Sequence, residues 1–284
     1  MEQINLPRAN SPEVAIPGTE LRKFHSNTLN QDLLIYVKFP LSYFKSNTTY
    51  PVLFSLDANR AFPLIANIAY YLEFPKALIP EIVFVGIGYQ ISGFEDWAAW
   101  RTRDLTPTVR EKVEKYWVET LSQMSGRNDI VVQTGGASRF LNFISEELIP
   151  FVESNYRVSS LNRGLLGYSY GGLFTLYALF QHAEIFSKYF AGSSTIAYDE
   201  GVIFKYEEEY ASTHLDLNAS VFMSAGSLED DDTIESMKEM VAQLQSRNYP
   251  NLKLESCIFD NEEHQSCVAA AIARGLRALY KQAG

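Results

Sequence analysis

Short apolar runs alternate with longer amphipathic ones along most of this 284-residue chain. Runs with strand character lie at 33–39, 52–56, 82–88, 164–168, 188–191, 221–225 and 252–259. Runs with helical character lie at 62–78, 139–154, 171–182, 233–247 and 264–282. Because alternating strands and helices form βαβ units, this order predicts an α/β fold with a mainly parallel sheet and helices on both faces.

The beginning of the chain departs from this alternation. Two apolar stretches within 21–39 are joined through 27–32, a connection of hairpin length, so we expect the sheet to begin with antiparallel strands. Nothing farther along the chain resembles a linker between domains. The pattern therefore predicts a single domain over residues 1–284.

The segment 89–138 has no clear strand character, although it contains all three tryptophans, Trp97, Trp100 and Trp117. Within it, 112–121 has the pattern of a short helix. Long irregular insertions in compact domains are usually functional or mobile. Two interpretations stay open: a lid or wall of a substrate pocket, or a loop that its aromatic residues pin to the surface.

Composition and charge narrow the classes of partner. The net charge is −10 and the basic residues form no run, which argues against nucleic acid. The first residues do not resemble a signal peptide and no segment has the apolar length of a membrane span, so we expect a cytoplasmic protein without membrane contact. The spacing of Cys257 and Cys267 fits neither a zinc site nor a disulfide framework, and we expect no metal and no cofactor.

The stretch Gly167-Tyr168-Ser169-Tyr170-Gly171 places a serine between two glycines, after an apolar run and before a helix-like one. This is the pattern of a nucleophile elbow, in which the serine occupies a strained turn from strand to helix. We expect the glycines at 167 and 171 to prevent collisions across that turn. The alternative is a glycine-rich turn in which the serine only caps the helix, but the flanking strand and helix patterns favour Ser169 as a nucleophile.

A nucleophile elbow predicts an acid and then a histidine farther along the chain. His264 fits, because it follows the last strand-like run and precedes an apolar helix-like one. His182 ends a helix-like run, His214 lies in a polar segment before a strand, and His25 precedes the serine. We therefore expect His264 to be the catalytic base.

The acid is expected after the strand-like run 221–225, where four carboxylates follow one another from 229 to 232. Glu229 is our first candidate, because it stands three residues beyond the glycine that ends the strand. A run of charged residues usually faces solvent, and at least two of these four carboxylates should do so. Asp230 and Asp232 stay open as alternatives.

An oxyanion hole is also required, and it is usually built from two backbone N–H groups. One should belong to Tyr170, directly after the nucleophile. The other should come from the loop after 52–56, where the N–H of Ala58 is the first choice and that of Asn59 the second.

Several motifs together resemble the putative-esterase family of α/β-hydrolases, which includes S-formylglutathione hydrolase, the mycolyltransferases and the siderophore esterases of the Fes and IroE type. The resemblance spans most of the chain and is greatest to the siderophore-esterase branch. It rests on 50–59, 101–107, 140–150, 167–172 and 226–229. It implies an α/β-hydrolase fold, with Glu229 as the acid and His264 as the base. Ala58 departs from the family pattern, which usually has glycine there.

The resemblance also suggests how a substrate could be held. Branch members that act on catecholate siderophores tend to carry basic residues near the site, and this chain offers Arg101, Arg103, Arg110 and Arg139. The chain is nevertheless acidic and rich in Tyr and Phe, so an uncharged or aromatic ester is an equal alternative. For Arg101 we also expect a structural alternative, in which it pairs with Asp104 and holds the long loop.

We expect substrate contacts from four residues: Asn59, Trp97, Trp100 and Arg101. The function expected from the sequence is a serine esterase that cleaves a small-molecule carboxylic ester through an acyl-enzyme. Acyl transfer to a hydroxyl acceptor, and a binding protein that has lost turnover, are the two alternatives.

Overall fold

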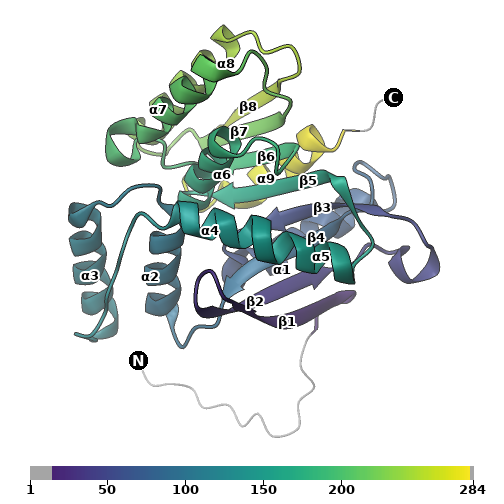
Figure 1. Cartoon of the computed structure of the whole chain (residues 1–284), viewed down its shortest axis with the longest axis horizontal. Helices are drawn as coiled ribbons and strands as arrows, with labels where there is room; N and C mark the ends of the chain where they lie inside the picture. Colours follow the sequence, from purple (N-terminus) through teal and green to yellow (C-terminus); the bar gives the residue numbers. More distant parts are fainter. Residues whose placement is uncertain (1–14, 282–284) are drawn as a thin grey trace, which may run out of the picture.

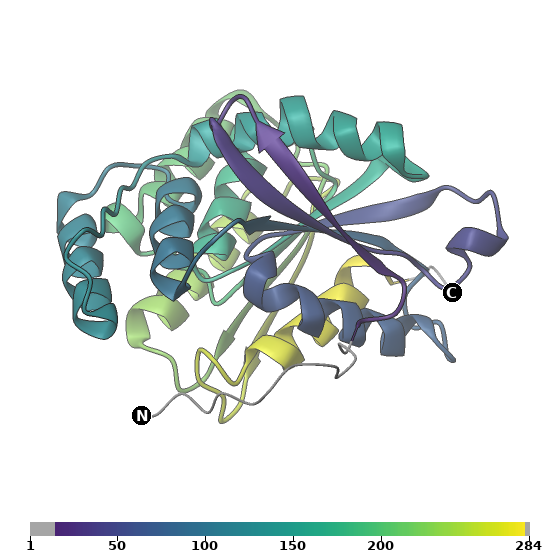
Figure 2. The same ribbon diagram turned by 90° about the horizontal axis from the view of Figure 1, so that it is seen from below.

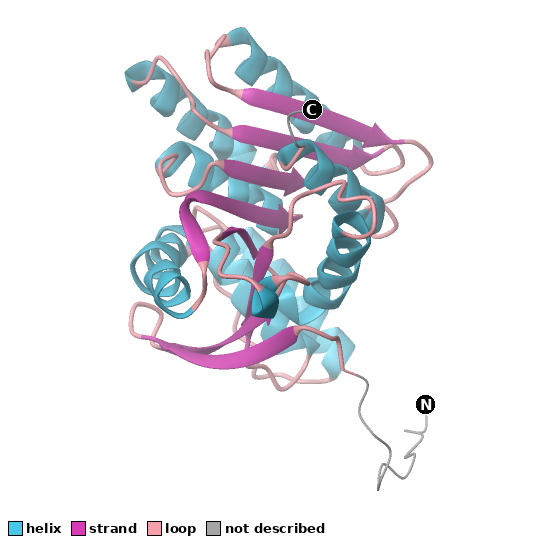
Figure 3. Ribbon diagram, turned by 90° about the vertical axis from the view of Figure 1, so that its right-hand side faces the viewer, coloured by secondary structure: helices cyan, strands magenta, loops and turns pink. Residues whose placement is uncertain are grey.

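The computed structural model describes residues 15–281. Its strands form one eight-stranded sheet in the order β1-β2-β4-β3-β5-β6-β7-β8. Pairing is antiparallel from β1 to β2 and from β2 to β4, and parallel across the rest of the sheet. The strands are β1 (Thr19–Ser26), β2 (Gln31–Lys38), β3 (Tyr50–Ser55), β4 (Val83–Tyr89), β5 (Val158–Tyr168), β6 (Lys188–Gly192), β7 (Ser220–Gly226) and β8 (Lys253–Phe259). The predicted mainly parallel sheet with an antiparallel beginning is confirmed (Figure 3).

Helices cover both faces of this sheet (Figure 1). In Figure 2, α1 (Ala58–Glu73) and α9 (Val268–Leu279) lie below the sheet. The other face is covered by α4 (Ala137–Phe143), the π-helical turn η2 (Ile144–Leu148), α5 (Ile149–Asn155), α6 (Tyr170–Gln181), α7 (Tyr198–Thr213) and α8 (Asp231–Ser246). A central strand contributes to both layers, because successive strand residues point to opposite faces. In β3, for example, Leu53 packs on the side of α1 and α9 and Phe54 on the other.

Segment 89–138 is more helical than the sequence predicted. It forms α2 (Phe94–Leu105) and α3 (Glu111–Ser125), at the left of Figures 1 and 2, where only a short helix over 112–121 was expected. The buried face of α2 includes Arg101, Thr102 and Asp104. Because these polar residues interrupt the apolar period, the sequence does not read as an amphipathic helix.

Helix α7 was not predicted either, and a buried charge explains why. Glu207 is fully buried on its inner face, where it accepts hydrogen bonds from Arg247 at 2.7 and 2.9 Å. A glutamate at a buried position interrupts the helical spacing of apolar residues, so hydrophobic periodicity does not identify the helix. One residue of the acidic run at 207–209 is therefore part of a buried ion pair and not of a solvated surface.

The described residues contain no helix that is both long enough and apolar enough to cross a bilayer. The chain also has a short 3₁₀ turn, η1 (Tyr43–Lys45), before β3. Because β3 and β5 to β8 run in parallel, their carboxyl ends share one edge of the sheet. The loops that leave this edge carry Ala58, Ser169, Glu229 and His264.

Candidate active site

Ser169 joins β5 to α6 in a strained backbone conformation. Its φ of 61° and ψ of −121° lie in a region that residues with a side chain rarely adopt. The turn is tight, because a Cβ added to Gly167 would lie 2.0 Å from the carbonyl oxygen of Gly171. The Ser169 side chain makes no capping hydrogen bond to α6. The geometry is that of an elbow, and the serine does not serve as a helix cap.

The second glycine that close packing requires is not the one predicted. A Cβ on Gly171 would meet no atom nearer than 3.5 Å, which is ordinary van der Waals contact. A Cβ on Gly172 would lie 2.1 Å from Ser194 Oγ and 3.0 Å from the carbonyl oxygen of Gly192. The steric expectation for residue 171 was therefore wrong, because the first turn of α6 presses its next residue, Gly172, against the end of β6.

Two substitutions test this account of the elbow. Gly167→Ala forces two backbone segments apart, so we expect it to lower the free energy of unfolding by about 3 kcal/mol or more. Gly171→Ala introduces no clash at a helical position, so we expect stability to stay level or to rise by up to about 1 kcal/mol. Urea unfolding of both variants measures the difference. Equal losses in the two proteins would contradict the assigned geometry.

His264 and Glu229 meet at the same edge of the sheet. His264 lies in the loop after β8, and its Nδ1 is 2.6 Å from Glu229 Oε2. The other carboxylate oxygen accepts hydrogen bonds from the Gly226 N–H and the Ser193 hydroxyl, both at 2.7 Å. The Glu229 side chain is 1% exposed and that of His264 37%, so a buried carboxylate faces a ring that solvent can reach.

Burial raises the pKa of the Glu229 carboxyl, but hydrogen bonds from His264, Gly226 and Ser193 lower it more, so the pKa lies below its usual value. The carboxylate is therefore ionised at neutral pH and can hold His264 by a charge-assisted bond. Asp230 instead caps α8 by accepting from the Thr233 N–H at 2.8 Å. Asp232 is exposed in the first turn of α8. Of the three candidate acids, only Glu229 contacts the histidine.

Tyr168 and Ser193 link these groups to the elbow. The Tyr168 hydroxyl, one residue before Ser169, donates to the carbonyl oxygen of His264 at 2.7 Å. Ser193 Oγ lies 2.6 Å from that same hydroxyl and 2.7 Å from Glu229. Ser193 itself has a φ of 38° and is 1% exposed. Sequence reasoning missed both residues, because no motif marks a contact between the ends of β5, β6 and β7.

The structure contains no hydrogen bond between the Ser169 hydroxyl and the His264 ring, both of which lie in its described part. Such bonds are often long in unliganded enzymes and shorten only when substrate binds. Tyr168, the residue before Ser169, contacts the His264 ring, with 5.2 Å between the two ring centroids.

The predicted oxyanion donors open two neighbouring helices. Ala58 is the first residue of α1 and Tyr170 the first residue of α6, so neither N–H has an acceptor within its own helix. The two helix starts lie close together, because a Cβ on Gly171 would be 3.5 Å from Asp57 Oδ2. Asp57 turns the chain into α1 with a φ of 55°. Two positive helix ends thus converge beside Ser169.

The chain is similar to known proteins over nearly its full length. Residues 26–271 match the family model described as putative esterase. The chain belongs to the putative-esterase family. The ferri-bacillibactin esterase BesA of Bacillus subtilis (strain 168) is 30% identical to this esterase over 271 residues, which are 92% of this chain and 89% of the relative.

A fungal relative and a solved structure extend the comparison. The siderophore triacetylfusarinine C esterase of Aspergillus fumigatus is 26% identical and covers 94% of this esterase, with 95% of its own length matched. The crystal structure of the BES protein from Bacillus cereus superposes with a TM-score of 0.79 at 25% identity, covering 97% of this chain and 100% of that one. These findings confirm the α/β-hydrolase fold and the resemblance to siderophore esterases. The protein is a carboxylic ester hydrolase.

Arg101 of this esterase has a different partner from the one expected. Its guanidinium binds both oxygens of Asp57, at 2.7 and 2.8 Å, and Asp104 is bound by Arg103 instead, at 2.7 and 2.9 Å. The expected pair between Arg101 and Asp104 was wrong, because helix α2 turns Arg101 toward the loop that opens α1. Arg101 also lies over the ring of Tyr170, with 5.4 Å to its centroid. It therefore ties the two helix starts together.

The other predicted substrate contacts lie beside this cluster. Asn59 donates to the Tyr89 carbonyl oxygen at 2.8 Å and accepts from the Tyr89 N–H at 2.7 Å, so its side chain joins α1 to the end of β4. Trp97 is 7% exposed beneath Arg101, and the Trp100 ring packs edge-on against Tyr89. Their roles toward substrate stay predictions. Trp117 of α3 donates to the Tyr170 hydroxyl at 3.3 Å and so brings segment 89–138 to the elbow.

Proposed function

We propose that this esterase cleaves a carboxylic ester through an acyl-enzyme on Ser169, with His264 as the base and Glu229 as the acid. The observation that carries the proposal is the 2.6 Å contact between His264 Nδ1 and the buried Glu229 carboxylate, beside a serine in an elbow conformation. A carboxylate on Nδ1 fixes the ring so that Nε2 can take the proton of a nucleophile.

The steps follow from these roles. His264 Nε2 accepts the hydroxyl proton while Ser169 Oγ bonds to the carbonyl carbon, and the oxyanion is held by the N–H groups of Ala58 and Tyr170. The ester C–O bond then breaks, and His264 returns the proton to the leaving alcohol. A water molecule, deprotonated by His264, then bonds to the acyl carbon. The bond to Ser169 Oγ breaks as His264 returns the proton to that oxygen, and the acid is released.

The substrate proposed is a siderophore-like ester, because the names of the relatives describe siderophore esterases. The ion pairs of the candidate arginines favour an ester that carries little net charge near its reacting carbonyl group. Three of the four arginines considered for an anionic ligand are already paired, Arg101 with Asp57, Arg103 with Asp104 and Arg110 with Asp199. A guanidinium held by a carboxylate offers less attraction to a second anion.

Three measurements on the purified chain test this function. It should hydrolyse a short p-nitrophenyl ester, release free acid without an alcohol acceptor, and be labelled at Ser169 by a fluorophosphonate. If the acyl group leaves the protein only when an alcohol is present, and then as an ester of that alcohol, acyl transfer is favoured instead. Absence of labelling at Ser169 in folded, active protein would overturn the proposed nucleophile.

Ser193→Ala removes one of the donors that hold the Glu229 carboxylate. A hydrogen bond to a charged group contributes about 1.5–3 kcal/mol, so we expect kcat to fall about 10- to 100-fold with KM little changed. Ser227→Ala is the matched control, because Ser227 lies in the same loop as Glu229 but accepts from the Asn261 N–H and does not bind the carboxylate. Steady-state kinetics of both variants make the comparison. An equal fall in both would contradict the positioning role of Ser193.

A further inference from the structure

A polar pocket lies at the opposite edge of the sheet from Ser169. Lys188, Ser220 and Lys253 are the first residues of β6, β7 and β8, and they pair in register across these strands. Paired residues on neighbouring strands point to the same face, and parallel strands lie about 4.8 Å apart. The two lysines are therefore about 10 Å apart at their Cα atoms, on one face, with a serine between them.

The lining of this amino-edge pocket consists mostly of hydrogen-bonding side chains. Its volume is about 550 Å³, and no acidic side chain lines it. Besides the two lysines it is lined by Ser159, Asn162, Ser187, Asn218, Ser220 and Asn251. Hydroxyl and amide groups can all donate hydrogen bonds to oxygen atoms of a ligand.

Neither of the two lysines forms an ion pair with a carboxylate of the described residues. Among residues 15–281, no Asp or Glu oxygen lies within 4.0 Å of either ammonium group. Lys188 Nζ donates to Asn162 Oδ1 at 2.6 Å and lies 5.1 Å from the centroid of the Tyr280 ring. Asp216, the acid bound to Asn251, accepts from that amide at 2.6 Å. Burial lowers the pKa of the Lys188 ammonium, and the charge of Lys253 lowers it as well.

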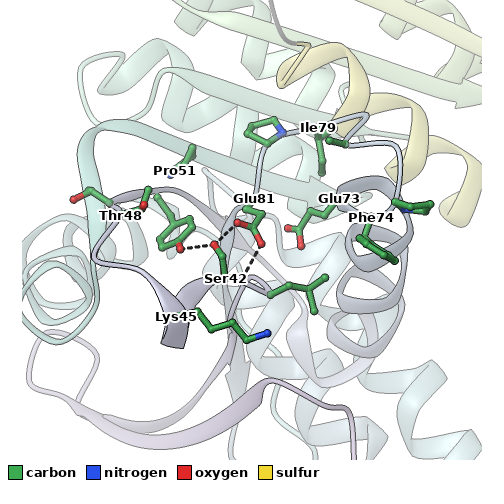
Figure 4. Close-up of a pocket in the computed structure, with 14 residues that line it drawn as sticks. Ser42, Lys45, Thr48, Pro51, Glu73, Phe74, Ile79 and Glu81 are labelled. Carbon is green, nitrogen blue, oxygen red and sulfur yellow. Dashed lines mark hydrogen bonds between the residues drawn. The ribbon is translucent and has the colours of Figure 1, made fainter.

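A larger pocket elsewhere on the chain shows the contrasting arrangement (Figure 4). It has a volume of about 860 Å³, and its lysine, Lys45, shares the lining with Glu73 and Glu81. Ser42 donates to Glu81, and the buried Lys38 forms an ion pair with Glu73. Acids accompany the cations there. In a protein of net charge −10, the lining of the amino-edge pocket thus contains two cations and no acid.

We propose that the amino-edge pocket binds a small oxyanion of the phosphate class. Two ammonium groups can each bond to anionic oxygens, and the serine and asparagine side chains can donate to the others. The site lies on the amino ends of β6 to β8, away from the loops that carry Ser169, Glu229 and His264. This proposal goes beyond ester hydrolysis and does not depend on it.

Calorimetric titration of the full chain with inorganic phosphate and with pyrophosphate tests the proposal, with chloride at equal ionic strength as the reference. We expect binding by the native chain, and affinity about tenfold weaker in Lys188→Gln and in Lys253→Gln, since each loses a charge-assisted bond. Lys45→Gln, which removes a lysine from the acid-lined pocket, should bind like the native chain. Ester hydrolysis should persist in all three variants and shows that they fold.

Two results would overturn the proposal. The first is no binding of either anion beyond that seen in chloride, and the second is equal weakening in Lys253→Gln and Lys45→Gln. Because Lys253 is exposed, its variant remains informative if Lys188→Gln does not fold. Sedimentation with phosphatidylglycerol vesicles distinguishes a lipid headgroup from a free anion. We expect the protein to stay in the supernatant, and binding to vesicles without binding of free phosphate would reject the site as assigned.

Discussion

Ser169→Ala should abolish hydrolysis of a p-nitrophenyl ester and labelling by a fluorophosphonate, with kcat lower by a factor of at least about 10⁴. Ser169 Oγ is the only protein atom in the proposed mechanism that bonds to the acyl carbon, so its loss leaves only the oxyanion donors and substrate binding. Stability should hardly change. Alanine also carries a Cβ, and the strained φ of 61° is already tolerated by serine.

The measurement is steady-state kinetics together with a urea unfolding curve for the same preparation. Ser227→Ala again provides a control that removes a serine hydroxyl near the site without touching the proposed nucleophile. If Ser169→Ala keeps more than about a tenth of the native kcat, the acyl-enzyme mechanism proposed here is wrong. If the variant instead loses its cooperative unfolding transition, the elbow is needed for folding, and labelling of the native protein decides the role of Ser169.

Glu229→Gln should lower kcat by about 10³- to 10⁴-fold with little effect on KM. The amide can still bond to His264, but it cannot stabilise the charged ring or enforce the tautomer that leaves Nε2 free to accept a proton. The adjacent carboxylate provides a matched control. Asp230→Asn keeps a good N-cap on α8, since asparagine and aspartate cap helices almost equally well, and its kcat should match that of the native protein.

Comparable losses in Glu229→Gln and Asp230→Asn would show that the carboxylate run acts through its total charge, and that the contact with His264 is not decisive. Acid titration of stability adds a second readout. The folded-state pKa of Glu229 is lowered, so its stabilising contribution is fully present above the unfolded-state pKa of about 4.3. That contribution disappears as pH falls through the lower folded value. The stability advantage of the native protein over Glu229→Gln should therefore shrink below about pH 4.

The fold was largely predictable because its signals are local. Strands β3, β4, β6 and β7 are short and mostly apolar, β5 ends in an apolar run, and the elbow places its glycine and serine within a few residues of one another. Helices α2 and α7 were not predicted in full, since Arg101, Asp104 and Glu207 occupy buried positions and break the apolar period. A polar residue in a core is stabilised by a partner from elsewhere in the chain, and hydrophobic periodicity does not identify that partner.

The sequence by itself determined the α/β order, the elbow around Ser169, and the loops in which an acid and a histidine should lie. Only the tertiary structure decided which side chains meet. It placed Glu229, and not Asp230 or Asp232, against His264, joined Arg101 to Asp57, and aligned Lys188 with Lys253 across three strands. The physical reason is that a local pattern fixes the backbone of an element, whereas these contacts depend on strand register and helix packing between segments far apart in the chain.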